Sequence, residues 1–112
     1  MNQKIDITYI EFKKQEIPVS KMIDIDGRLY SLEIQYNEVH DFYVAILYDD
    51  NEKPIISSKL VYRCNAFHAC CENMPEKKLI PLTVNDLSGV QSETELRLSA
   101  ETFEDSIKIY LI

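Results

Sequence analysis

One segment, residues 25–56, constrains the fold of this chain more than any other. It contains two strand-like runs, residues 28–36 and 42–48, which are joined and flanked by polar turns. The first run alternates between apolar and polar residues, which is the period of a half-buried strand. The second run is apolar at every position and predicts an inner strand that is covered on both faces. Together they predict a β-meander and an all-β fold.

The turn residues support the same interpretation. Asp26-Gly27 separates a short strand at residues 21–25 from residues 28–36, and Asp-Gly is typical of a two-residue type I′ turn in which Gly27 takes a positive φ. Residues 37–41 and 49–53 predict two further turns. Because the chain has only two glycines, its other turns must depend on Asp, Asn and Pro.

The rest of the chain predicts further short strands. They cover residues 5–12, 54–56, 59–63, 78–84, 94–98 and 106–112, with an interruption at Ser57-Ser58. Pro54 indicates an edge position and Pro81 an edge position or a bulge, because proline lacks a backbone donor. Residues 65–74 have no clear period and predict a loop or one helical turn, and residues 91–95 are compatible with another helical turn. The apolar end at Ile112 is expected to be packed or paired.

These elements predict one β domain over residues 1–112, with residues 1–16 as a first strand or arm. The predicted architecture is a small β-sandwich or partly open barrel of about eight short, mostly antiparallel strands. A chain of 112 residues with 46 % hydrophobic and 28 % charged residues has the size and composition of one globular domain.

The net charge of −7 and the scattered basic residues argue against nucleic acid as a partner, because phosphate binding needs a positive stripe. The acidity fits solubility, or complementarity to a basic protein surface. There is no apolar run of about 20 residues to span a membrane, and the amino terminus lacks a signal-like apolar core. Three cysteines, with Cys70 and Cys71 adjacent, fit a reducing cytoplasm better than a disulfide framework.

Two groups of residues contain the side chains that metal sites use. Asp24 and Asp26 with Gly27 resemble part of a calcium loop, but the glycine comes too early and a hairpin turn is favoured. The zinc-type donors lack the usual Cys-x2-Cys spacing and are expected to pack instead; they are Cys64, His68, Cys70 and Cys71. The acidic residues Asp49, Asp50 and Glu52 are interpreted as a solvated turn. No metal or cofactor is predicted.

Catalytic motifs are equally weak. The two histidines are His40, in a turn, and His68, and neither lies in a recognisable nucleophile motif. A carboxylate pair for glycoside hydrolysis stays open, since its spacing is set in space rather than in sequence. We predict no catalytic residue. The strand tyrosines are expected to be core and cross-strand partners rather than a sugar platform, with some at a protein interface; they are Tyr30, Tyr36, Tyr43 and Tyr48.

The order of these pieces resembles the small baseplate plug proteins of contractile-tailed phages and phage-tail-like particles. The similarity begins at Ile17-Pro18 and covers most of the remaining chain. Its motifs are Asp26-Gly27-Arg28-Leu29, Ile34-Gln35-Tyr36-Asn37, Tyr43-Val44-Ala45-Ile46, Pro54-Ile55-Ile56 and the final Ile109-Tyr110-Leu111-Ile112. The chain differs from the family where Phe42 or Tyr43 takes the place of a tryptophan and in residues 64–71, which match no motif.

The resemblance implies a non-enzymatic structural protein near the junction of the tail tube and the central hub. Its implied partners are baseplate hub and tail tube proteins, in one or several copies. Its implied location is the cytoplasm of the producing bacterium during assembly and then the baseplate. Residues 5–12 and 106–112 are the expected edge strands for partner contact. The alternative is a small β-sandwich module that binds a carbohydrate or a peptide, and an enzyme of unrecognised type comes third.

Overall fold

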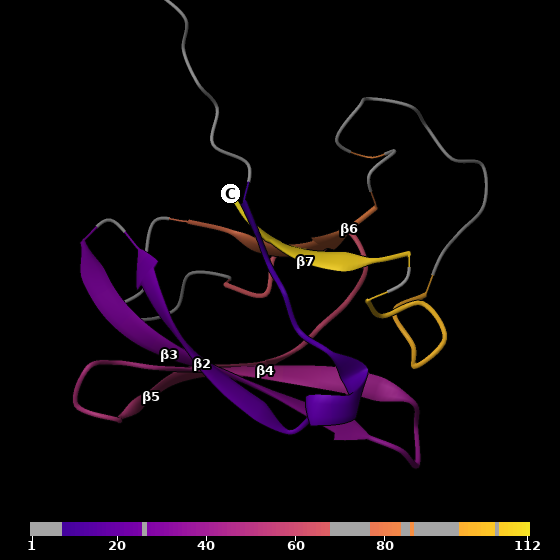
Figure 1. Ribbon diagram of the computed structural model, residues 1–112, viewed down its shortest axis with the longest axis horizontal. Helices are drawn as coiled ribbons and strands as arrows, with labels where there is room; N and C mark the ends of the chain where they lie inside the picture. The colour runs from indigo at the N-terminus through magenta and orange to yellow at the C-terminus, as the bar shows by residue number, and fades with distance from the viewer. Residues whose placement is uncertain (1–7, 26, 68–76, 84–85, 87–96, 105) are drawn as a thin grey trace, which may run out of the picture.

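The computed structural model describes residues 8–25, 27–67, 77–83, 86, 97–104 and 106–112. Two antiparallel sheets pack as an open sandwich, which confirms the predicted all-β fold (Figure 1). The elements are β1 (Thr8–Ile10), the 3-10 helix η1 (Lys14–Glu16), β2 (Val19–Ile25), β3 (Arg28–Asn37), β4 (Phe42–Tyr48), β5 (Pro54–Lys59), β6 (Leu79–Leu82) and β7 (Lys108–Leu111). In this part of the chain no helix is long and apolar enough to cross a membrane.

The four-stranded sheet has the order β2-β3-β4-β5 and is the predicted meander. Ile25 pairs with Arg28, so a two-residue connection joins β2 to β3. Gly27 has a φ of 84°, and its N–H donates to Asp24 Oδ1 at 2.9 Å. The predicted hairpin is therefore confirmed, because this φ is one that glycine adopts at little cost.

The predicted interruption in the fourth strand of the meander is wrong. β5 runs without a break, with Ser57 opposite Ile46 and Ser58 opposite Ala45. The ladder is made by backbone groups, so two small polar side chains at the sheet edge do not end it. The strand predicted at 59–63 instead ends at Lys59, and the Leu60 N–H makes one last bond to the Tyr43 carbonyl at 2.8 Å before the chain turns.

The three-stranded sheet has the order β1-β7-β6, which corrects the expectation that residues 106–112 form an edge. β7 is apolar enough to be covered on both sides, and it pairs with β1 along one side and β6 along the other. Beyond β7, Ile112 and Lys78 exchange backbone hydrogen bonds of 2.8 and 2.9 Å, so the apolar end is paired as predicted. Pro54 and Pro81 lie on the edge strands β5 and β6, which confirms their predicted positions.

Several predictions fall wholly or partly outside the described residues. These are residues 5–7 of the first strand, residues 68–74 of the predicted loop, residue 84, residues 91–95 and residues 94–96 of the predicted strand at 94–98. Arg97 and Leu98 are described and belong to no strand. The polar stretch before Ile17 contains the short helix η1.

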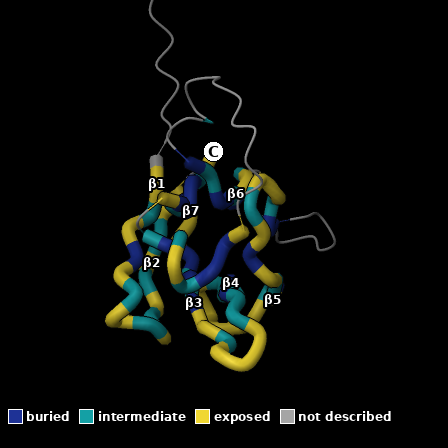
Figure 2. Tube along the Cα trace, turned by 90° about the vertical axis from the view of Figure 1, so that its right-hand side faces the viewer, coloured by how far each residue is buried: buried dark blue, intermediate teal, exposed yellow. Residues whose placement is uncertain are grey.

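The core lies between the two sheets and is built by alternate residues of each strand (Figure 2). The Tyr43 ring stacks on that of Phe103, 4.3 Å between centroids, and both side chains are buried. The aromatic contact joins the meander to the segment that precedes β7. The fully buried side chains of the core include Leu32, Ile34, Leu47, Leu60, Leu79, Phe103, Ile107 and Ile109.

β4 is central in its sheet, but the prediction that both of its faces are covered is wrong for the described part of the chain. Tyr43, Ala45 and Leu47 are buried, whereas the residues between them are only half-buried. A second layer covers one face of the meander. On the other face, among the described residues, the side chains are shielded by their cross-strand neighbours. The half-buried residues are Phe42, Val44, Ile46 and Tyr48.

Candidate interaction surface

The outer face of the four-stranded sheet is the surface of the sandwich that points away from the second sheet. Met22 lies opposite Ser31 and Ser31 lies opposite Tyr48, so one cross-strand row places Met22 and Tyr48 on this same face. Met22 is 67 % exposed and Leu29 is 49 % exposed. Apolar side chains that gather on an exposed sheet face are a signature of a protein interaction site.

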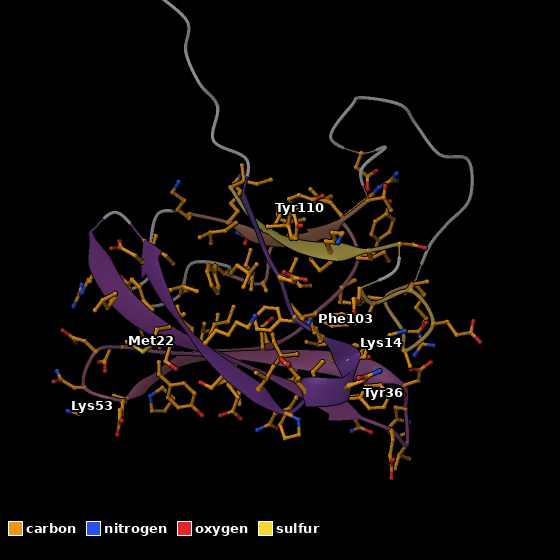
Figure 3. All side chains as sticks on the ribbon, in the orientation of Figure 1. Lys14, Met22, Tyr36, Lys53, Phe103 and Tyr110 are labelled. Carbon is orange, nitrogen blue, oxygen red and sulfur yellow. The ribbon has the colours of Figure 1, made fainter. Side chains whose placement is uncertain are left out.

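A hollow of about 410 Å³ opens at one end of this face, and we call it the β4–β5 hollow. Its floor is the Met22–Ser31–Tyr48 row, and the turn from β4 to β5 forms its rim. Figure 3 shows Met22 and Lys53 at this end of the sheet. The lining residues are Ser20, Met22, Ser31, Tyr48, Asp49, Asp50 and Glu52.

The rim is held by hydrogen bonds within the β4–β5 turn. Asp49 Oδ1 accepts from the N–H groups of Asn51 and Lys53, both at 2.9 Å. The Asp49 N–H donates to the Lys53 carbonyl at 2.9 Å, and Glu52 N–H donates to the Asp49 carbonyl at 3.1 Å. Asp49 therefore builds the turn, as expected of a turn acid, and leaves Asp50 and Glu52 exposed beside the hollow.

A polar cluster at the opposite end of the meander is structural, and we call it the Asp41 cluster. Asp41 Oδ1 accepts from the Tyr36 hydroxyl at 2.7 Å and from the Ala100 N–H at 2.9 Å. Arg97 Nη2 donates to the carbonyls of His40 and Asp41, each at 2.8 Å. The cluster ties the β3–β4 turn to residues 97–100.

The same contacts shift two pKa values. The Ala100 N–H, followed by the Tyr36 hydroxyl, lowers the pKa of Asp41, since both favour the charged carboxylate. The bond to Asp41 raises the pKa of Tyr36. Tyr36 was predicted to be a core and cross-strand residue. It is a cross-strand partner of Tyr43, with 4.8 Å between ring centroids. It is not in the core, because it is 36 % exposed at the end of β3, where its hydroxyl reaches the turn.

A second structural cluster surrounds Asp86. Its carboxylate accepts from Arg63 Nη2 at 2.7 Å, from the Thr83 N–H at 2.9 Å, and from the hydroxyls of Tyr62 and Thr83. Burial alone raises the pKa of Asp86, but these bonds outweigh it and hold the pKa at about 2. The cluster fixes the chain after β5 against the end of β6.

The candidate chemical sites do not come together in the described residues. No group of three or more His, Cys, Asp or Glu side chains there could hold a metal ion. Cys64 was expected to pack, but it is exposed. The other zinc-type donors, His68, Cys70 and Cys71, lie outside the described residues. His40 stacks on Phe42, 6.4 Å between centroids, in the β3–β4 turn.

The strand tyrosines do not form a shared platform. Tyr30 and Tyr43 are buried in the core, which confirms that part of the prediction. Tyr48 is half-buried on the floor of the β4–β5 hollow. Burial raises the pKa of Tyr43 to about 12, as expected for a core phenol.

The hollow itself was missed from the sequence, although two signals pointed to it. Met22 alternates with Ile23 on a strand whose apolar residues otherwise face the core, and residues 42–48 are apolar on both faces. The acidic turn at Asp49, Asp50 and Glu52 was correctly predicted as a turn. The cross-strand register that places this turn beside Met22 could not be predicted from the sequence pattern.

The edge strands are less suited to pairing with another chain. β1 has three residues, and β5 and β6 each carry a proline. On β2 the core-facing Lys21 donates to the Glu11 carbonyl, and its ammonium lies 5.3 Å from the Phe12 ring centroid. Short edges, prolines and inward-pointing charges are the features that discourage strand addition. The outer face is therefore better suited to a partner contact than the edges are.

Comparison with known protein families gives a match over nearly the whole chain. A family model described as "Cyanophage baseplate Pam3 plug gp18" matches residues 7–112. No match was found among curated proteins or among solved structures.

Proposed function

Since this chain belongs to the family of the cyanophage baseplate plug gp18, and so is a structural component of a phage baseplate, we propose that it plugs or braces the junction between the central hub and the tail tube. Family membership also confirms the resemblance seen in the sequence. In this proposal the partners are hub and tail tube proteins. One or several copies assemble in the cytoplasm of the producing bacterium and remain in the baseplate.

The observation that carries the proposal is the apolar outer face of the four-stranded sheet. A domain with one free, partly apolar sheet face and blunted edges is suited to being held between neighbours by side-chain contacts. We propose that residues 1–112 act as one domain and that residues 1–16 serve as its first strand or arm.

We further propose that the protein has no catalytic activity. The shifted pKa values of Asp41, Asp86 and Tyr43 each follow from hydrogen bonds or burial that hold the fold together. Catalytic groups, by contrast, are expected to converge on a cleft. This supports a role that depends on shape and surface.

Cross-linking within the assembled particle tests the proposal. Tails produced with a tagged copy of this chain are treated with a short amine-reactive cross-linker, and the linked peptides are identified by mass spectrometry. We expect links from surface lysines, such as Lys53 and Lys59, to hub and tail tube proteins. Both lysines flank the outer face, and Lys59 lies opposite Val44.

Links only to sheath or fibre proteins would contradict the proposed position. Absence of the chain from purified tails would contradict the proposed function itself. A well-behaved monomer that instead binds a member of a glycan or peptide panel would favour the alternative of a small binding module.

A further inference from the structure

We propose that the β4–β5 hollow binds a lysine or arginine side chain presented by a protein segment of a neighbouring baseplate component. The inference deepens the proposed function and rests on it, because it assigns the chemistry of one contact made by the outer face. It commits to a basic side chain from another protein and not to a second copy of this chain.

The floor of the hollow suits the aliphatic part of such a side chain. Met22 is 67 % exposed, and Tyr48 presents part of its ring beside it. Lysine and arginine bury their methylene stems along apolar surface while the charged head stays near polar groups. A methionine adapts to different shapes, and a tyrosine ring attracts a cation.

The rim suits the charged head. The carboxylates of Asp50 and Glu52 are exposed and have no hydrogen-bond or ion-pair partner among the described residues. Lys53, the cation of the same turn, is not part of the lining. The rim therefore presents at least two uncompensated negative charges, and Asp49 holds them in place through the bonds that build the turn.

The size of the hollow fits the same occupant. A volume of about 410 Å³ exceeds that of one arginine side chain and leaves room for an apolar neighbour on the partner segment. An anionic ligand would meet the acidic rim and be repelled. The hydroxyls of Ser20 and Ser31 are bonded to each other at 2.8 Å, so they add a polar wall without a free charge.

The first test follows Met22 directly in the full-length protein. The chain has three methionines, and with methyl-labelled methionine the Met22 signal is assigned through a Met22→Leu variant. The probe is an acetylated and amidated Leu-Arg-Leu tripeptide, and its matched control replaces arginine with uncharged citrulline. We expect the arginine peptide to shift the Met22 signal in a saturable and salt-sensitive manner and the control to bind more weakly.

Charge variants identify the rim. The double variant D50N/E52Q should weaken binding of the arginine peptide by about three- to tenfold, as expected for loss of exposed ion pairs. The control E16Q/E101Q removes the same charge from exposed positions outside the hollow and should leave binding unchanged.

Equal weakening by both variants would overturn the proposal, as would equal binding of the two peptides or no shift of the Met22 signal. A Met22 signal that changes with protein concentration alone would assign the hollow to a second copy and would also overturn it.

The particle experiment separates this inference from the proposed function. If D50N/E52Q reduces cross-links to the hub or tail tube and E16Q/E101Q does not, the inference is supported. If wild-type protein gives those cross-links and D50N/E52Q gives them equally, the hollow is not the contact, but the proposed function stands. If the wild-type protein gives none, the proposed function fails whatever the variants do.

Discussion

At the scale of single residues, Asp86 joins parts of the chain that are distant in sequence. Its carboxylate is 10 % exposed and accepts hydrogen bonds from Tyr62 and Arg63 as well as from Thr83. The bonds to Arg63 and Tyr62 span 23 and 24 residues of sequence. Such a contact adds stability only while the carboxylate is charged, because a protonated acid accepts these bonds less well.

We predict that Asp86→Asn lowers the free energy of unfolding at neutral pH by about 2 kcal/mol, since the donors of Thr83, Tyr62 and Arg63 lose a charged acceptor. The folded-state pKa of Asp86 is about 2, below the ordinary 3.8. Its contribution is therefore complete above the ordinary pKa and is lost as the pH falls through the folded-state value. Urea unfolding of both proteins across this range should show the difference shrinking towards pH 2. A difference that is constant with pH would contradict the assignment.

At the scale of elements, the β2–β3 hairpin shows how far local sequence determines structure. The Asp-Gly turn and the alternation of residues 28–36 predicted the hairpin. The φ of 84° at Gly27 confirms that the turn uses a glycine to reach a positive φ. An added Cβ at Gly27 would meet no atom within 4 Å, so only the backbone conformation opposes a side chain there.

We predict that Gly27→Ala destabilises the protein by about 1 kcal/mol, because alanine is strained at this φ. Gly27→Asn should cost less, since asparagine tolerates the left-handed region better than other residues with a side chain. Thermal unfolding of the three proteins measures the order. Equal melting temperatures for the alanine and asparagine variants would show that φ does not set the cost.

The elements that were predicted wrongly depend on contacts between distant segments. Turn chemistry and alternation are local, so they specify the meander from β2 to β5. The central position of β7 depends on pairing with β1, about 100 residues earlier in the chain, and no local pattern encodes that choice. That the outer side of β4 is only half-buried likewise depends on where the second sheet packs. Its apolar composition alone predicted that a second layer would cover it.

At the scale of the whole molecule, the two faces of the meander differ in their energetic role. Leu47 is fully buried in the core between the sheets, whereas Met22 lies on the outer face. Burial removes apolar area from water and fills space that the surrounding side chains cannot refill completely. The inner face should therefore determine stability, and the outer face should be free to serve a partner.

We predict that Leu47→Ala lowers the free energy of unfolding by about 3 kcal/mol. The matched surface change Met22→Ala should alter it by no more than about 0.5 kcal/mol. Urea unfolding monitored by tyrosine fluorescence compares the two variants. A large loss of stability in Met22→Ala would mean that the outer face is part of the core.

The central position of β7 also sets the order in which the molecule is completed during synthesis. β2 to β5 are made consecutively, and each pairs with the next, so the meander needs only short-range encounters. The second sheet must wait, because β7 is the last of the seven described strands to leave the ribosome and both β1 and β6 pair with it. Until then the inner face of the meander stays uncovered, and a nascent chain in this state exposes the surface that chaperones recognise.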